Sequence, residues 1–271
     1  LVTVMCARPN LPGFIIFMSF LPNWGILSVQ SLCFAGAIIL LCLIFALNEY
    51  RTPYPLFDMT LLKIRLFLYP VLGGALLFTS LFCIMFIMPF YLVYPCGFKA
   101  STTGFIMIIP FFFLMVISPI SGILYTKSGS RILCTAGMIA IIVSLFSFLT
   151  IEPSAEIFPI FWRISLVGIG TALYISPNNT VIMNNVPIRR RGIASGSIAT
   201  ARNLGMVIGV ALAGQVFSAY FSELTNGASL EEYIPVMKPF FMISFRRVLI
   251  AGIVFSIIGL WITLMRGKES V

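Results

Sequence analysis

Residues 66–98 read LFLYPVLGGALLFTSLFCIMFIMPFYLVYPCGF and contain no charged side chain between Arg65 and Lys99. A helix needs about 20 mostly apolar residues to cross the hydrocarbon core of a bilayer. The chain lacks the strict alternation that a strand of a membrane barrel requires, and runs such as 37–47 are apolar on every face. The stretch therefore predicts a membrane-spanning helix.

The same pattern recurs along the whole chain, of which 60% is hydrophobic and 9% is charged. A soluble domain carries roughly 25% charged residues, so the composition indicates an all-α, polytopic membrane protein. Residues 11–21 are apolar but too short to cross a bilayer, and we expect a shortened or truncated span there. Charged and turn-forming residues separate the full spans that we expect near 26–47, 68–94, 102–125, 132–151, 159–183, 192–222 and 246–265.

The Lys and Arg residues are divided unequally between the two sides of these spans. The connections between spans fall alternately on one side of the membrane and on the other. The connections on one side hold four Lys and Arg residues, Lys99, Lys238, Arg246 and Arg247, together with five of the eight acids. By the positive-inside rule the richer side is cytoplasmic, which places the C-terminus in the cytoplasm of a multi-pass protein of the plasma (inner) membrane. The richer side holds ten: Arg51, Lys63, Arg65, Lys127, Arg131, Arg189, Arg190, Arg191, Arg266 and Lys268.

Composition also excludes several chemistries. The chain has no His, which removes Ser-His-Asp catalysis, His metal sites and His proton relays. Its six Cys lie mostly inside apolar runs without metal-type spacing, and no cluster of acidic or nucleophilic residues predicts an enzyme acting on lipids. The net charge of +9 is better explained by the positive-inside rule than by nucleic acid. We therefore expect a bilayer as partner and no enzymatic activity, cofactor, metal or nucleic acid.

The short connection Gly122-Ile-Leu-Tyr-Thr-Lys-Ser-Gly-Ser-Arg131 joins two expected spans on the cytoplasmic side. Glycine permits a tight turn where two helices meet, and Lys127 and Arg131 can contact helix C-terminal carbonyls or lipid phosphates. On these residues alone, an ordinary positive-inside turn accounts for the stretch.

Together with its flanks, this connection resembles the loop signature G-x-L-x-D-R-x-G-R-R of the major facilitator superfamily. Gly122, Leu124, Lys127, Gly129 and Arg131 match the signature. Thr126 and Ser130 stand where the family often has Asp and Arg. The resemblance implies a loop that steadies one conformation of a transporter, without the contact that the Asp makes.

Two further regions resemble the fourteen-span drug:proton antiporters of this superfamily. The likeness runs from about residue 11 to 266. It implies a linker region over 1–66, with one partial and one full span, followed by a C-terminal six-helix bundle over 67–271. The matching stretches are Trp24-Gly25, Glu49-Tyr-Arg51, Pro55-Leu-Phe-Asp58, Leu61 to Phe67, Gly168-Ile-Gly170, Pro177, Val186-Pro187, Arg191 to Gly196 and Thr200 to Gly205.

The resemblance implies the C-terminal half of a transporter that exports small amphipathic or cationic compounds in exchange for protons. No Asp or Glu lies in the middle of an expected span, so an intramembrane acid for proton coupling must come from an N-terminal half. The alternatives are an exporter of lipid, peptide or siderophore on the same fold, or a truncated remnant that does not transport.

Arg202 is the charged residue expected near mid-membrane, roughly 15 Å along its helix from Gly192. A central Arg costs about 2.5 kcal/mol or more, so it should face a cavity or a partner. With Asn203 it either lines the pathway or gate, or ties two helices together. Other polar side chains within spans have the same two interpretations: Tyr174, Asn178, Asn179, Thr79 and Ser80.

Small residues recur every four positions on the helix that carries Arg202. Such a row allows a second helix to approach closely, and sliding of the two helices during transport is the alternative interpretation. The row consists of Ser197, Ala201, Gly205, Gly209 and Ala213.

Overall fold

The computed structural model describes residues 61, 63–153, 156–227 and 230–267. These residues belong to one compact unit that begins at Leu61. The expected spans at 11–21 and 26–47 lie outside the described residues, and the division between 1–66 and 67–271 stays a prediction.

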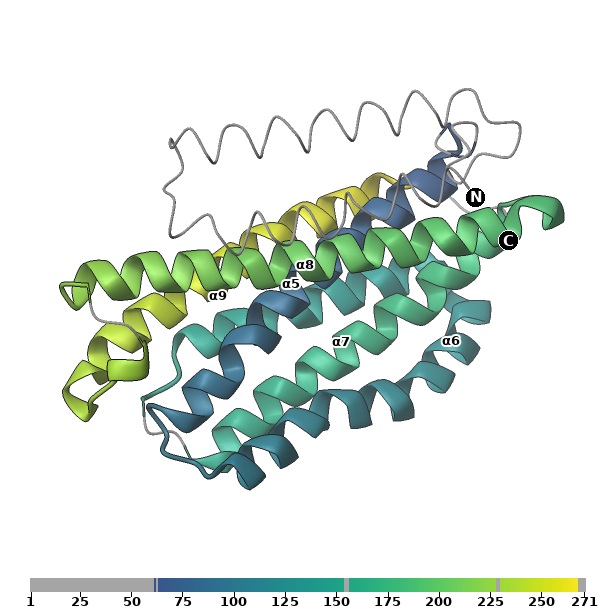
Figure 1. Ribbon diagram of the computed structural model, residues 1–271. Coiled ribbons are helices and arrows are strands. Elements are labelled where there is room, and N and C mark those ends of the chain that lie inside the picture. The colour runs from purple at the N-terminus through teal and green to yellow at the C-terminus, as the bar shows by residue number, and fades with distance from the viewer. Residues whose placement is uncertain (1–60, 62, 154–155, 228–229, 268–271) are drawn as a thin grey trace, which may run out of the picture. The chain divides into compact units, whose positions relative to one another are not determined.

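The described residues form helices joined by short turns and contain no strand (Figure 1). Five helices are long and apolar enough to cross a membrane, which confirms the all-α membrane fold. Three short 3-10 turns lie in the connections: η1 (Ile188–Arg190), η2 (Leu230–Glu232) and η3 (Pro235–Met237). The long helices are α5 (Arg65–Val93), α6 (Ala100–Leu149), α7 (Ile157–Asn184), α8 (Arg191–Leu224) and α9 (Lys238–Met265).

Helix α6 consists of two segments that meet at Gly129, whose φ of 71° and ψ of 164° are not helical. Only glycine adopts this region without a steric cost, so the break falls at the residue that can make it. The two segments correspond to the spans expected near 102–125 and 132–151. The connection is shorter than expected, because Gly122 and the residues up to Ser128 remain helical.

Helix α9 is longer than the span expected at 246–265. It begins at Lys238, eight residues before the expected start. A proline in its first turn is tolerated there, since the amide that it lacks has no helical acceptor. Arg246 and Arg247 are exposed within the helix, and the Arg247 guanidinium lies 5.1 Å from the centre of the Tyr220 ring. Charged residues limit the part of a helix that can lie within the bilayer, but the backbone hydrogen bonds of the helix can continue beyond those residues.

Helix α5 packs against α7, α8 and α9, and α6 packs along α7 (Figure 1). Buried apolar side chains such as Leu77, Ile84 and Met138 form the core between them. Large apolar side chains remain exposed on the outside; Phe105 and Phe158 are both 74% exposed. That distribution suits a bundle whose outer surface contacts lipid tails rather than water.

The row of small residues on α8 brings this helix against the backbone of α5. A Cβ atom added at Gly205 would collide with the Ala75 carbonyl, and one added at Gly209 with the Thr79 carbonyl. Ala213 continues the same buried face. The geometry is that of close helix packing, and sliding of the two helices stays a prediction.

Candidate functional site

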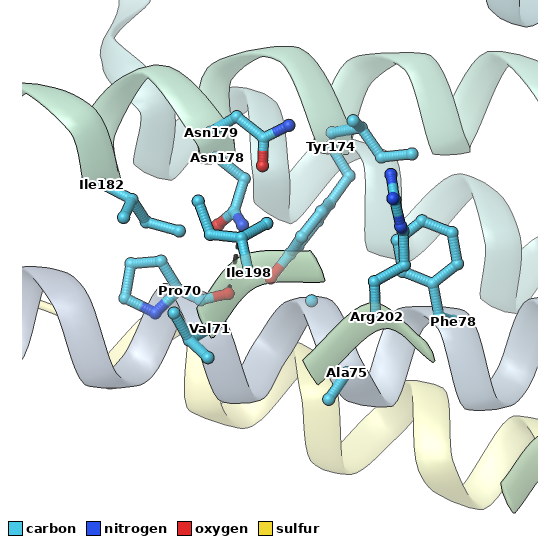
Figure 2. Close-up of a pocket in the computed structure, with 12 residues that line it drawn as sticks. Pro70, Val71, Ala75, Phe78, Tyr174, Asn178, Asn179, Ile182, Ile198 and Arg202 are labelled. Carbon is cyan, nitrogen blue, oxygen red and sulfur yellow. Dashed lines mark hydrogen bonds between the residues drawn. The ribbon is translucent and has the colours of Figure 1, made fainter. Parts of the chain in front are cut away.

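A small pocket opens between α5, α7 and α8 (Figure 2). Its volume is about 30 Å³, which is room for little more than a water molecule. Apolar side chains make up most of its lining, and Arg202 is its charged member. The lining residues are Pro70, Val71, Gly74, Ala75 and Phe78 of α5, Tyr174, Ile175, Asn178, Asn179 and Ile182 of α7, and Ile198 and Arg202 of α8.

Asn178 brings a polar group to this apolar lining. Its side-chain amide donates a hydrogen bond of 3.1 Å to the Pro70 carbonyl oxygen and so ties α7 to α5 (Figure 2). The residue is only 4% exposed, and its side-chain oxygen has no hydrogen-bond partner among the described residues. A buried acceptor without a partner costs about 1–3 kcal/mol, so Asn178 offers a ready site for a donor.

Tyr174 forms another part of the lining and is 1% exposed. Its hydroxyl lies 3.5 Å from the Thr263 hydroxyl of α9, which itself donates to the Gly259 carbonyl. The Tyr174 ring therefore supplies a fixed wall, and its hydroxyl is engaged in a contact between helices.

Arg202 is exposed on α8, with its guanidinium carbon 6.0 Å from the centre of the Phe78 ring (Figure 2). A guanidinium over an aromatic ring gains a modest cation–π attraction. The described residues that line the pocket include no acid, so Arg202 gives this wall a positive charge. Arg202 can thus donate to an anionic or hydrogen-bond-accepting group in the pocket.

The structure separates the other polar residues that the sequence grouped with Arg202. Asn179 lines the pocket, whereas Asn203 is exposed and does not line it. Ser80 shares a hydrogen bond with Ser256 of α9, and Thr79 donates 3.0 Å to the Ala75 carbonyl of its own helix. These contacts of Thr79 and Ser80 favour helix packing, and a pathway role for Asn203, Thr79 or Ser80 stays a prediction.

Eight of the twelve lining residues were missing from the sequence-based set: Pro70, Val71, Gly74, Ala75, Phe78, Ile175, Ile182 and Ile198. Phe78 is one of 26 Phe and carries no signal of its own. Pro70 offers its own carbonyl oxygen to Asn178, and the sequence does not single out that carbonyl, because a proline inside a helix leaves the carbonyl one turn earlier without its donor instead.

The connection at Gly129 places Lys127 and Arg131 on an exposed surface at one end of the bundle. Thr126, which stands where the family often has Asp, donates 2.8 Å to the Ile123 carbonyl of its own helix. Thr126 therefore makes a local contact rather than the contact between helices that an Asp makes in the family. Nowhere in the described part of the chain do three or more His, Cys, Asp or Glu gather in a way that could hold a metal ion.

The sequence matches the Major Facilitator Superfamily over residues 11–210. The chain belongs to this superfamily. Its members are transporters, which confirms the expectation of a transporter rather than an enzyme.

Relatives of this superfamily chain carry names from drug resistance and vitamin transport. It is 29% identical over 215 residues to the multidrug resistance protein Stp of Mycobacterium tuberculosis, covering 79% of this chain and 40% of Stp. It is 26% identical to the riboflavin transporter RibZ of Clostridioides difficile, in an alignment that covers 68% of this chain and 40% of RibZ. It is 25% identical to the lincomycin resistance protein LmrB of Listeria monocytogenes, in an alignment that covers 91% of this chain and 52% of LmrB. The chain thus spans between about two-fifths and one half of the length of these relatives.

Proposed function

We propose that the chain forms one wall of the substrate pathway in a transporter that exports small amphipathic or cationic compounds in exchange for protons. The observation that carries this proposal is the pocket between α5, α7 and α8, whose mostly apolar lining includes the buried Asn178 and the charged Arg202. Substrate sites of transporters lie near the bilayer midplane, and the sequence predicts a position near that plane for Arg202. The names of Stp and LmrB support a drug-like substrate.

The pocket is one wall rather than a complete site. Pockets for drug-sized ligands measure about 300–1,000 Å³, far more than the 30 Å³ found here. In a transporter built from repeats, the site forms where two bundles meet and rock against each other. We infer that a second bundle completes the cavity over the face that Arg202 and Asn178 present.

Charge limits what the described residues contribute to coupling. Their acids lie near helix ends and connections and not within the middle of a membrane helix: Glu152, Glu156, Glu223, Glu231 and Glu232. Arg202 repels a cation at the pocket and attracts an anion. The carboxylate that exchanges protons, or that binds a cationic substrate, therefore comes from outside the described residues.

A transport assay tests the proposal. Everted vesicles from cells that make the protein should accumulate a fluorescent amphipathic dye when their lumen is acidified. A protonophore should abolish this accumulation, because it removes the gradient that drives exchange. Vesicles from cells without the protein are the control. Dye accumulation that persists unchanged with the protonophore would contradict proton coupling, and equal accumulation in both kinds of vesicle would contradict transport.

A further inference from the structure

A second hollow lies at the end of the bundle that holds the Gly129 break. It is an open groove of about 770 Å³ between the second segment of α6 and the end of α9. On α6 it is lined by residues 128–132, Thr135, Ala136 and Ile139, and on the other side by Leu264 of α9 and by Gly267 just beyond that helix. This volume suits a ligand of several hundred daltons, unlike the pocket at Arg202.

One end of the groove is polar and positively charged. Ser128, Gly129 and Arg131 line it, and Lys127 is exposed immediately before Ser128. The left-handed conformation of Gly129 turns the chain there, so that the two α6 segments leave the break in different directions. The described residues that line the groove include no acid, so none of them neutralises Arg131.

Apart from Thr135, the rest of the groove is apolar. Ile132, Ala136 and Ile139 follow one another at intervals of four and three residues, which places them on one face of the helix over about 10 Å. Ile132 is 63% exposed and Ile139 is 46% exposed, and Leu264 faces the groove from α9 at 40%. An apolar strip therefore leads away from the positively charged end.

We propose that this groove binds an anionic phospholipid, with its phosphate at Arg131 and an acyl chain along Ile132, Ile139 and Leu264. A lipid head group supplies a negative charge opposite Arg131 that the described lining residues do not provide, and the acyl chain covers the exposed apolar strip. Basic pockets between membrane helices are known sites for anionic head groups. A free phosphate would use only the polar end and would leave the apolar strip uncovered.

Native mass spectrometry of the full 271-residue chain tests the site. The purified chain is titrated with phosphatidylglycerol or with phosphatidylcholine of the same acyl composition. We expect the first phosphatidylglycerol to bind about fivefold more tightly than phosphatidylcholine. Arg131→Gln should remove that preference, whereas Arg189→Gln, an exposed arginine at the same end but outside the groove, should keep it.

Two further arms identify the source of the phosphate and the role of the strip. Glycerol phosphate at millimolar concentration should not displace the lipid. Ile132→Ser should lower the affinity for phosphatidylglycerol and for phosphatidylcholine by a similar factor. Equal binding of the two lipids, retention of no lipid, displacement by glycerol phosphate, or equal effects of Arg131→Gln and Arg189→Gln would each overturn the proposal. The result does not depend on transport, so it stands or falls separately from the proposed function.

Discussion

At the scale of single residues, Arg202 and Asn178 bring polarity to a pocket whose surroundings are apolar. The sequence predicts that Arg202 lies near mid-membrane, where an Arg costs at least about 2.5 kcal/mol, and a cation–π contact with Phe78 at 6.0 Å offsets only part of that cost. The Asn178 oxygen likewise carries the penalty of a buried acceptor without a partner in the described chain. Polar residues that destabilise the isolated bundle are expected where a ligand or a second bundle supplies the missing interactions.

Arg202→Ala should lower the rate of dye transport at least tenfold while the amount of protein in the membrane stays normal. The expected loss reflects the removal of the charged group in the pocket lining. Leu204→Ala is the matched control, because Leu204 is exposed on α8 two residues after Arg202 but does not line the pocket. The measurement is initial dye uptake in everted vesicles, normalised to protein by immunoblot. Equal rates in the wild type and Arg202→Ala would remove Arg202 from the mechanism.

At the scale of elements, α5 and α8 form a pair whose backbones meet at Gly205 and Gly209. Close backbone approach increases van der Waals contact, which drives helix association in lipid, where the hydrophobic effect between helices is absent. The Ser80–Ser256 hydrogen bond adds a polar link from α5 to α9. These contacts make α5 the central helix of the described bundle.

Two glycine-to-alanine changes on α8 should shift stability in opposite directions. Gly209→Ala places a methyl group against the Thr79 carbonyl and should lower the free energy of unfolding by about 1–3 kcal/mol. Gly196→Ala meets no atom within 4 Å and should raise it by about 0.5–1 kcal/mol through helix propensity. Thermal unfolding of the purified variants in detergent measures both. A Gly209→Ala variant as stable as the wild type would show that α5 and α8 are not held at this distance.

The break in α6 permits a second matched comparison. Gly129→Ala forces a residue with a Cβ into positive φ and should destabilise the chain by about 1–2 kcal/mol. Gly122→Ala lies in regular helix with its nearest neighbour, the Ser176 hydroxyl, at 3.6 Å, and should be neutral or slightly stabilising. The same thermal assay distinguishes them, and equal melting temperatures would place the break elsewhere.

At the scale of the whole described bundle, charge is distributed unequally between its two ends. Lys127, Arg131, Arg189, Arg190 and Arg191 lie where α6 breaks and where α7 passes into α8. Gly129 and Gly267 line one groove, so the end of α9 lies at the same end. The acids Glu152, Glu156 and Glu223 lie near the opposite ends of α6, α7 and α8. This division supports the proposed orientation, with the basic end in the cytoplasm.

Reporter fusions test this orientation. Green fluorescent protein joined after Val271 should fluoresce, and alkaline phosphatase at the same position should be inactive, because both report a cytoplasmic location. Fusions after Gly227, in the connection between α8 and α9, should give the reverse pattern. A phosphatase that is active after Val271 would place the basic end outside.

The sequence alone determined the fold class, the family and the approximate position of each described membrane helix. Burying a charge in lipid is costly, so long gaps between charged residues mark spans whatever the helices later contact. Gly129 was likewise foreseeable as a turn, because its conformation follows from its own lack of a Cβ. The early start of α9 was missed because charged residues such as Arg246 mark the end of a membrane span, whereas a helix outside the bilayer can contain them at no such cost.

Only the tertiary structure decided which polar residues share a pocket. Arg202 and Asn203 are neighbours in sequence, yet they lie on different faces of α8, and only Arg202 meets Asn178 and Phe78 at one site. Likewise, Arg131 lines the same groove as Leu264, more than a hundred residues away. These groupings depend on how each helix is rotated about its axis and on which neighbour it meets, and both are set by packing between helices rather than by local sequence.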